Sequence, residues 1–321
     1  MSEVRSASWA AAMPAEMPVV TVVVATHQRA AMLPGLVASL EAQDLDAFEV
    51  VVADDGSTDG TWEVLEDLAG STSLALLALR LPPSGGPSVP RNTAASRARS
   101  PVLAFTDDDC LPEPGWLRAL LAAGSGVVQG CTLPLEEPHG LWDRTIEVRE
   151  LSGLWETCNL AMPARVFAEL GGFPVLTAVS GAPRGFGEDL LLGAAAAREV
   201  GGAFAPDAVV RHRWLPGSYA EHLRSRRRLI GFPFLAGQVP ELRDRLWHRV
   251  FLSRRTATVD LGLVGLAVGL LTRRRWALLA ALPWLRQARA ESSRPVQVMV
   301  ADTVAAAALL EGSLRHRRPV L

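Results

Sequence analysis

The sequence predicts an α/β fold, with a mostly parallel sheet flanked by helices and a C-terminal, Arg-rich helical region. Three observations predict it. Runs of apolar and β-branched residues alternate with segments of helical period between residues 18 and 215. Clusters of acidic residues follow several of these runs directly. Beyond residue 215 the acidic residues become sparse and arginines flank short apolar runs.

Four of the apolar runs are expected to be strands of one sheet. They cover residues 18–25, 48–53, 74–79 and 101–106, with helices expected at 32–43, 62–68 and 91–98. Ligands of parallel sheets bind at the carboxyl ends of the strands. The loops that begin at Thr26, Asp54 and Asp107 should therefore converge on one site.

Composition divides the chain at about the same place. The 321 residues, 49% of them hydrophobic, can form one large domain or two smaller ones. Residues 1–210 hold 12 Arg and 27 Asp/Glu (−15), whereas residues 211–321 hold 20 Arg and 7 Asp/Glu (+13). We expect a disordered leader at 1–17, a catalytic domain at 18–215 and a helical region at 216–321. The three cysteines lack metal-site spacing and are expected to be buried free thiols.

The strand at 101–106 ends in three consecutive carboxylates, Asp107, Asp108 and Asp109. Three like charges beside a core repel one another unless a cation or water surrounds them. A hard divalent ion binds one or two carboxylates and fills its other positions with water and phosphate oxygens. The motif therefore points to a metal site, and the alternative is an acidic turn that caps the following segment.

Together, these motifs resemble the family-2 glycosyltransferases, which have the Rossmann-like GT-A fold. The resemblance rests on Val51–Asp59 with its Asp54-Asp55 pair, on Arg91-Asn92 and on Phe105–Asp109, in that order, within residues 18–215. It implies transfer of a sugar from a nucleotide-diphosphate donor to an acceptor hydroxyl, with inversion and with Mn²⁺ or Mg²⁺. A dehydrogenase is disfavoured because no GxGxxG motif follows the first strand.

The resemblance assigns nucleotide-sugar contacts to three loops. Asp55 would bind the base or ribose with Asp54 beside it, although the same turn could simply cap a helix. His27 stands where the family often has an aromatic residue. The implied contacts are Ala25, His27, Arg29, Asp54, Asp55, Arg91, Asn92, Asp107 and Asp108.

Catalytic roles follow from two further motifs. Glu188-Asp189 resembles the family's Glu-Asp pair at a helix start, which makes Asp189 the expected general base and Glu188 its catalytic neighbour. Capping of that helix is the structural alternative. The metal would be held by Asp107, Asp109 and His212, and an ordinary surface position remains the alternative for His212. Trp155 is expected in the core rather than in the acceptor site.

The region 216–321 leaves two interpretations open. Its apolar runs, such as 261–272 and 276–285, are each shorter than the ~20 residues that a spanning helix needs. Arginines beside Trp and Leu favour helices lying on the inner face of the cell membrane, in a cytoplasmic enzyme with a lipid-linked or envelope acceptor. The other interpretation is a helical subdomain packed on the sheet. No nucleic-acid partner is expected.

Two rival functions remain at this point. The chain could be an inactive nucleotide-sugar-binding or membrane scaffold protein. It could also be a sugar-1-phosphate nucleotidyltransferase, although the Gly-rich first loop of those enzymes is missing at 25–29. The donor sugar, the base and the acceptor are not readable from the sequence, because specificity lies in loops that no motif fixes.

Overall fold

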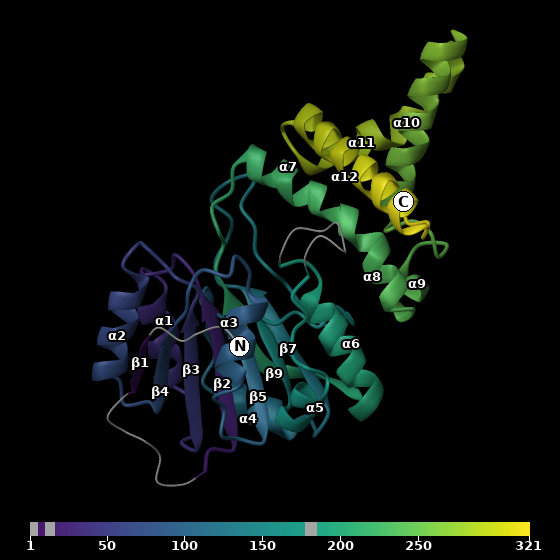
Figure 1. Ribbon diagram of the computed structural model, residues 1–321. Helices are drawn as coiled ribbons and strands as arrows, with labels where there is room; N and C mark the ends of the chain where they lie inside the picture. Colours follow the sequence, from purple (N-terminus) through teal and green to yellow (C-terminus); the bar gives the residue numbers. More distant parts are fainter. Residues whose placement is uncertain (1–5, 10–16, 177–184) are drawn as a thin grey trace. The chain divides into compact units, whose positions relative to one another are not determined.

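The computed structural model describes residues 6–9, 17–176 and 185–321 (Figure 1). The chain forms two compact units. The first comprises Met1–Glu137, Thr145–Val175 and Gly187–Leu215, and the second comprises Pro138–Arg144, Leu176–Phe186 and Pro216–Leu321. The second unit therefore takes two short segments from within the 18–215 range as well as the C-terminal region.

Within the described residues, the first unit holds a nine-stranded sheet in the order β1-β4-β3-β2-β5-β8-β7-β9-β6. The strands are β1 (Ser6–Trp9), β2 (Val20–Thr26), β3 (Phe48–Asp54), β4 (Leu76–Arg80), β5 (Val102–Asp107), β6 (Cys110–Pro112), β7 (Val127–Pro134), β8 (Asn159–Pro163) and β9 (Gly202–His212). Strands β2, β3, β4 and β5 pair in parallel, as do β7 and β9. The α/β class is confirmed, but the sheet is mixed, because β1, β6 and β8 run antiparallel to their neighbours.

One strand lies in the leader that was expected to be disordered. Ser6–Trp9 pairs antiparallel with β4 as β1, so the expectation is wrong for these four residues. Without this partner β4 would be an edge strand with unpaired backbone groups, which readily accept another strand. The rest of the leader up to residue 16 lies outside the described residues.

Six helices accompany the sheet in the described part of the first unit. They are α1 (Leu33–Glu41), α2 (Thr61–Ser71), α3 (Ser88–Ala95), α4 (Trp116–Ala122), α5 (Ala164–Glu169) and α6 (Glu188–Val200). In α1 the residues Leu33, Leu36 and Leu40 lie on one face at helical spacing, and all three are buried against the sheet. The hydrophobic effect of this apolar core fixes the strands, and so fixes where their ends lie.

Strand register brings the predicted loops together. Thr26 of β2 pairs with Asp54 of β3, and Ala25 pairs with Asp107 of β5. The short strand β6 pairs with β9, placing Cys110 opposite His212. The ends of four strands therefore meet at one edge of the sheet, as parallel geometry predicts for β2, β3 and β5.

The second unit is helical in its described part. It contains α7 (Tyr219–Arg227), η1 (Arg228–Gly231), α8 (Phe232–Gln238), α9 (Glu241–Arg245), α10 (Arg254–Thr272), η2 (Arg275–Ala281), α11 (Leu282–Glu291) and α12 (Pro295–His316). Its buried side chains include Asp302, whose carboxylate accepts hydrogen bonds from Arg255 (2.9 Å) and from the Trp284 indole (2.9 Å). These contacts tie α10, α11 and α12 together.

Two helices of this unit, α10 and α12, have the length and apolar composition of a membrane-spanning segment. The apolar run at 261–272 is by itself too short to span, but α10 extends back to Arg254 through polar residues. Helix α12 has 22 residues and includes the polar Asp302 and Thr303 in its interior. Length and composition alone are weak support for spanning, because the core helix of a soluble protein passes the same test. The two helices differ in burial, with 22% of the apolar window buried in α10 and 44% in α12.

Candidate active site

A cavity of about 490 Å³ opens at the strand ends of the first unit. Its walls come from the loop after β2, from the start of α3 with the glycines before it, and from the acidic motif after β5. Eight predicted residues line it: Ala25, His27, Arg29, Asp55, Arg91, Asp107, Asp108 and Asp109. The structure therefore places in one cavity most of the nucleotide-sugar residues that the resemblance implied.

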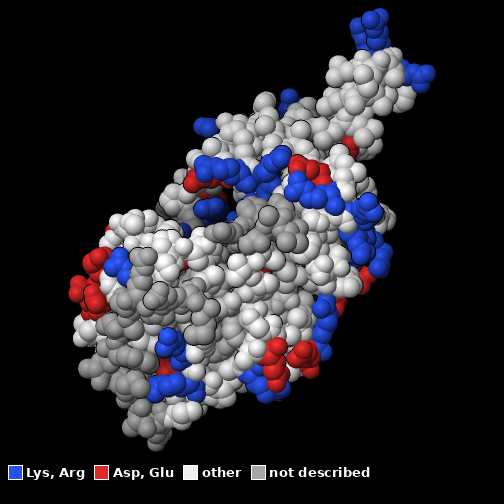
Figure 2. Space-filling view, viewed as in Figure 1, with Lys and Arg blue, Asp and Glu red and all other residues white. Residues whose placement is uncertain are grey.

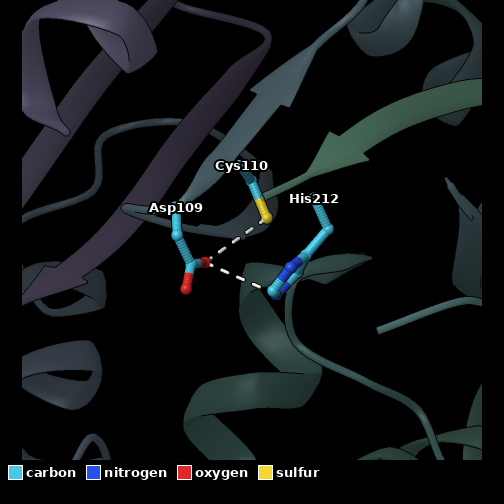
Figure 3. Close-up of side chains that lie close together, drawn as sticks. All are labelled: Asp109, Cys110 and His212. Carbon is cyan, nitrogen blue, oxygen red and sulfur yellow. Dashed lines mark hydrogen bonds and ion pairs between the residues drawn. The ribbon is translucent and has the colours of Figure 1, made fainter. Parts of the chain in front are cut away.

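The acidic motif lies beside a buried histidine (Figure 3). The Nε2 atom of His212 is 3.5 Å from Oδ1 of Asp109, and its Nδ1 atom is 2.8 Å from the carbonyl oxygen of Arg213. A carbonyl can only accept, so Nδ1 carries a proton, and this hydrogen bond orients the ring with Nε2 towards Asp109. Metal-binding histidines are commonly held by such a hydrogen bond from the other ring nitrogen.

Cys110 belongs to the same cluster, and the sequence argument did not single it out. Ligand atoms of Asp109, Cys110 and His212 all lie within 4.8 Å of one another, and all three residues are buried. Carboxylate oxygen and imidazole nitrogen suit Mn²⁺, and a nearby thiol adds a softer donor. Burial raises the pKa of the Cys110 thiol well above its usual value, so it is a neutral neighbour unless a cation displaces its proton. The donor set fits a divalent metal.

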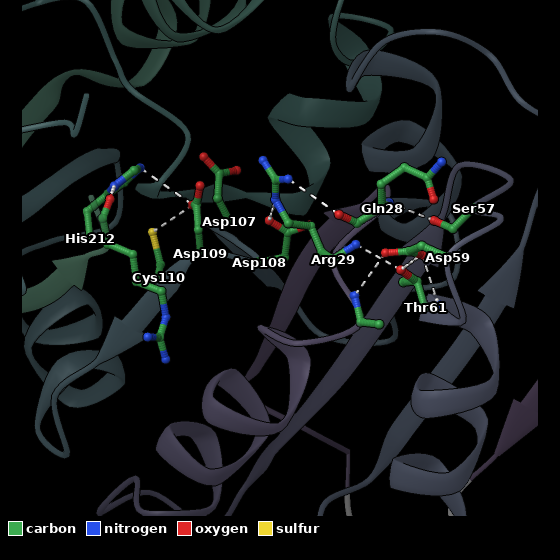
Figure 4. A network of polar contacts seen from close by, with 12 residues as sticks. Gln28, Arg29, Ser57, Asp59, Thr61, Asp107, Asp108, Asp109, Cys110 and His212 are labelled. Carbon is green, nitrogen blue, oxygen red and sulfur yellow. Dashed lines mark hydrogen bonds and ion pairs between the residues drawn. The ribbon is translucent and has the colours of Figure 1, made fainter. Parts of the chain in front are cut away.

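Crowding of carboxylates gives the motif an electrostatic reason to hold a cation (Figure 4). Burial, with the charge of Asp109, raises the pKa of Asp108 to about 7. Burial, with the charge of Asp107, raises the pKa of Asp109. Arg29 offsets part of this repulsion, because its Nε atom is 3.5 Å from Asp108. A bound cation would favour the ionised form of all three carboxylates.

Arg91 connects the acidic motif to the start of α6. Its Nη2 atom donates to Oδ1 of Asp107 at 2.6 Å, and its Nη1 atom is 3.8 Å from Oε1 of Glu188. The guanidinium carbon lies 5.7 Å from the centre of the Phe173 ring. Arg91 is 7% exposed, so this is a buried charge surrounded by two carboxylates and an aromatic ring.

The predicted catalytic pair begins α6. Glu188 is buried, whereas Asp189 is partly exposed and accepts a hydrogen bond from its neighbour Leu190. Burial, with the charge of Glu188, raises the pKa of Asp189 to about 7. Neither carboxylate lines the cavity itself. They adjoin it through Arg91, whose positive charge acts on both of them as well as on Asp107.

Two predicted nucleotide contacts have other partners. Asp54 is fully buried, and its carboxylate accepts from the amide and the hydroxyl of Ser57, so it shapes the turn before α2. The side chain of Asn92 donates to the carbonyl oxygen of Phe173 and accepts from its amide, both at 2.8 Å. Asn92 thus fixes the Gly171–Pro174 turn, which in turn places Phe173 against Arg91. Neither residue lines the cavity.

Asp55 and His27 lie at the cavity, and Asp55 also organises its wall. The Asp55 carboxylate accepts from the amides of Ser84 (2.6 Å) and Gly85 (3.1 Å), which holds the glycine loop in place. That loop was expected only to connect two elements, although its Gly85-Gly86 pair was a signal that the backbone can approach a neighbouring group closely. The exposed His27 ring has one nitrogen 3.1 Å from the carbonyl oxygen of Asp55, which leaves a face free for stacking.

Trp155 provides core contacts. Trp155 is 6% exposed and packs closely on Gly193 and Gly202, where any added Cβ would lie 2.3 and 2.4 Å from it. The prediction of a core role for Trp155 is confirmed. All three cysteines are buried free thiols, also as predicted.

Comparison with known proteins agrees with this arrangement. The sequence profile described as Glycosyl transferase family 2 matches residues 21–125. Validoxylamine A glucosyltransferase of Streptomyces hygroscopicus subsp. jinggangensis is 30% identical over 205 residues, which is 49% of this chain and 47% of that protein. A Campylobacter jejuni enzyme named GalNAc(5)-diNAcBac-PP-undecaprenol beta-1,3-glucosyltransferase is 30% identical over 93 residues, 29% of this chain and 30% of its own. The chain spans about half the length of the first of these relatives, and less of the second.

Solved structures show the same fold. Mannosyltransferase PcManGT of Pyrobaculum calidifontis, in complex with GDP-Man and Mn²⁺, superposes with a TM-score of 0.58 at 23% identity, covering 96% of this chain and 90% of that one. Residues 1–349 of Staphylococcus aureus TarS with UDP-GlcNAc superpose with a TM-score of 0.52 at 19% identity, covering 93% and 92%. Residues 21–125 therefore match the sequence profile of glycosyl transferase family 2, and the chain has the GT-A fold of these solved structures.

Proposed function

We propose that the chain is an inverting, metal-dependent glycosyltransferase that moves a sugar from a nucleotide-diphosphate donor to an acceptor hydroxyl. One observation carries the proposal. Arg91 lines the cavity, pairs with Asp107 of the acidic motif and lies beside Glu188 at the start of α6, so this one side chain links the two predicted halves of the site. An acidic metal motif and a carboxylate with a raised pKa, here that of Asp189, are the groups that such a transfer needs.

The donor would occupy the cavity between the loops after β2 and β5. Asp55 and His27 are placed to bind the base and ribose, by a carboxylate hydrogen bond and by ring stacking. Arg29 and Arg91 would bind the diphosphate, exchanging their contacts with Asp108 and Asp107 for phosphate oxygens. The complexes of the two structural neighbours with GDP-Man and UDP-GlcNAc support a donor of this class.

Asp107, Asp109 and His212 would hold Mn²⁺ or Mg²⁺. When bound, the ion would act as a Lewis acid and neutralise charge on the departing diphosphate. The Mn²⁺ in the Pyrobaculum neighbour supports a metal of this kind. The hydrogen bond of His212 to Arg213 keeps its Nε2 atom directed at the acidic motif, so this ligand would be oriented before any ion binds.

Asp189 would act as the general base. It accepts the proton of the acceptor hydroxyl while that oxygen bonds to the anomeric carbon, and the bond between this carbon and the diphosphate oxygen breaks on the opposite face. Inversion follows from this single displacement. A raised pKa makes the Asp189 carboxylate a stronger base than an ordinary aspartate, and the charge of Glu188 contributes to it. Of the two carboxylates, only Asp189 is partly exposed and so can reach an acceptor.

Release of nucleoside diphosphate from a nucleotide sugar in the presence of Mn²⁺ tests the proposal, after a thermal-shift screen of UDP-, GDP- and dTDP-sugars has identified the donor. We expect Asp109→Ala to lower release by roughly 10³-fold, since a metal contributes several kcal/mol to the barrier. Asp67→Ala, an exposed change on α2, is the matched control and should be silent. Nucleotide binding without release would indicate the inactive binding protein instead. Pyrophosphate release would indicate the nucleotidyltransferase.

We also propose that the enzyme acts at the inner face of the cell membrane on a lipid-linked or envelope acceptor. Two apolar helices in the second unit support this location. The undecaprenol in the name of the Campylobacter relative supports a lipid-linked acceptor. Transfer of labelled sugar to lipid extracts, compared with transfer to water-soluble acceptors, tests the acceptor class. Transfer confined to the soluble acceptors would contradict it.

A further inference from the structure

The hairpin formed by α10 and η2 (residues 254–281) has its small side chains inside and its large apolar side chains outside. On α10, Gly262, Gly265 and Gly269 are buried. A Cβ at Gly265 would lie 2.6 Å from the carbonyl oxygen of Ala277, and one at Gly269 would lie 2.6 Å from the Leu278 side chain. The glycines therefore allow the two legs to approach closely. Packing through small residues is typical of helices that associate inside membranes.

Four large apolar residues of the same helix point outward, although Val259 near its start is buried. Leu261, Val264, Val268 and Leu271 follow one another at helical spacing, and all four are exposed. Leu270, Trp276 and Leu279 extend this apolar surface around the end of the hairpin, at 76%, 66% and 63% exposure. An apolar surface of this extent on a soluble protein marks a site of interaction.

Charge identifies what the surface faces. Arg273, Arg274 and Arg275 join the two legs, are fully on the surface, and make no ion pair with any residue that the structure describes. In the space-filling view, blue arginine atoms lie at the end of this hairpin, next to white atoms of uncharged residues (Figure 2). Apolar residues beside clustered arginines and an exposed Trp match the interface of an anionic membrane, with its acyl chains and phosphates.

The length of the apolar surface indicates how the hairpin lies. From Leu261 to Leu271 an α-helix rises about 16 Å, whereas the hydrocarbon core is about 30 Å thick. Insertion end-on would carry the three arginines of the turn towards the bilayer centre, where charge is costly. Below Leu261, Arg255 is already bound to Asp302 and Glu291 of the second unit. A hairpin lying along the surface lets its arginines stay among the headgroups.

We propose that the α10–η2 hairpin is a membrane anchor that lies in the plane of an anionic lipid surface, burying its exposed apolar side chains from Leu261 to Leu279 in one leaflet. The inference deepens the membrane location within the proposed function. It is tested by lipid binding alone, without any sugar transfer, so failure of either claim can be told apart from failure of the other.

Flotation of the whole chain with phosphatidylcholine vesicles, with and without phosphatidylglycerol, is the test. We expect binding that needs the anionic lipid. The double substitution Leu270→Ser with Leu271→Ser should weaken it roughly 100-fold, since two exposed leucines lose their burial in lipid. The triple substitution Arg273→Gln, Arg274→Gln, Arg275→Gln should weaken binding to anionic vesicles by a similar factor. These side chains are exposed, so folding should be intact, and thermal unfolding checks that it is.

The matched control is the double substitution Val296→Ser with Leu314→Ser. Both residues are apolar, lie in α12 outside the hairpin and are 72% exposed. This variant should bind vesicles as the unmodified chain does. Equal loss in both apolar variants, or no binding by the unmodified chain, would overturn the proposal. Bound chain that resists extraction by alkaline carbonate would also overturn it, because this would indicate a spanning helix. Dimers that form without vesicles and dissociate on the leucine substitutions would overturn it as well.

Discussion

Helix α1 of the first unit and helix α10 of the second distribute their side chains in opposite ways. In α1 the large residues Leu33, Leu36 and Leu40 are at most 1% exposed. In α10 three of the four buried residues are glycines, the fourth being Val259, while Leu271 is 85% exposed. Both helices are apolar, so composition does not distinguish them. The size of a helix's buried side chains, rather than the overall hydrophobicity of the helix, therefore indicates what the helix contacts.

This contrast predicts that substitutions in the two units affect different properties of the protein. Every candidate catalytic side chain lies in the first unit, where large apolar residues fix the strand ends. The exposed apolar surface of α10 and η2 lies in the second. Substitutions in the first unit should therefore change chemistry or folding stability. Substitutions on the outer face of the hairpin should change affinity for lipid and leave both of those properties alone.

The largest effect is expected for Asp189→Asn. Loss of a general base lowers turnover by ~10²–10⁴-fold, whereas donor binding, which uses the cavity residues, should remain within a few-fold. The rate of nucleoside diphosphate release gives the first quantity, and titration with the donor gives the second. Equal losses in donor affinity and in turnover would contradict a base role and would make Asp189 a structural cap of α6.

The pH profile of the same pair of proteins sharpens the assignment. A base must be ionised to accept a proton, and the pKa of Asp189 is raised to about 7. In the unmodified enzyme kcat/KM should therefore rise with pH up to about 7 and then level off. The pKa of Asp108 is also raised to about 7, so the rise alone does not identify the group. Loss of this rise in the Asp189→Asn variant would identify Asp189 as the titrating group. A rise that persists in the variant would exclude Asp189.

Removing a large buried side chain from α1 comes next. Leu33→Ala should lower the free energy of unfolding by about 2–5 kcal/mol, because it leaves a cavity under a fully buried helix face. Urea unfolding followed by tryptophan fluorescence measures it, with circular dichroism as a second probe of whether the two units unfold together. A cost below about 1 kcal/mol would mean that α1 is not fixed by these leucines.

A pair of Gly→Ala substitutions examines the small residues inside the hairpin. Gly265→Ala places a methyl group 2.6 Å from both the Ala277 carbonyl oxygen and the Ala280 Cβ, and overpacking of this kind costs about 1–3 kcal/mol. Gly70→Ala in α2 meets no atom within 4 Å and should stabilise its helix by about 0.4–1 kcal/mol. Thermal unfolding of both variants should thus give shifts of opposite sign. Shifts of the same sign would show that the legs of the hairpin are not closely packed.

The site could be predicted from the sequence to the extent that strand geometry dictates it. Thr26, Asp54 and Asp107 each end a β-branched or apolar run, and parallel strands bring such ends to one edge. Burial shows where that prediction stops, because Asp54 is fully buried and accepts from Ser57, and of this pair only Asp55 lines the cavity. Asn92 shows another limit, since its partner Phe173 is 81 residues away.

Strand direction was less predictable than strand position. β8 enters the sheet between β5 and β7 in the opposite direction, and nothing in its composition distinguishes it from a parallel strand. Pairing of β6 with β9 likewise depends on long-range contacts, and it is this pairing that brings Cys110 and His212 together. The start of the Arg-rich region could be predicted from the change in composition. Which of its apolar residues face outward could not be predicted, because that depends on how the hairpin packs.

The smallest expected effect gives the most direct test of the contrast between α1 and α10. Leu271→Ala is the same chemical change as Leu33→Ala, but at a position that is 85% exposed, so the free energy of unfolding in buffer should stay within about 0.5 kcal/mol of its original value. Urea unfolding under the conditions used for Leu33→Ala measures it. A cost of about 2 kcal/mol or more would mean that Leu271 packs against protein in solution. The outer face of α10 would then be an ordinary core surface, and the contrast with α1 would vanish.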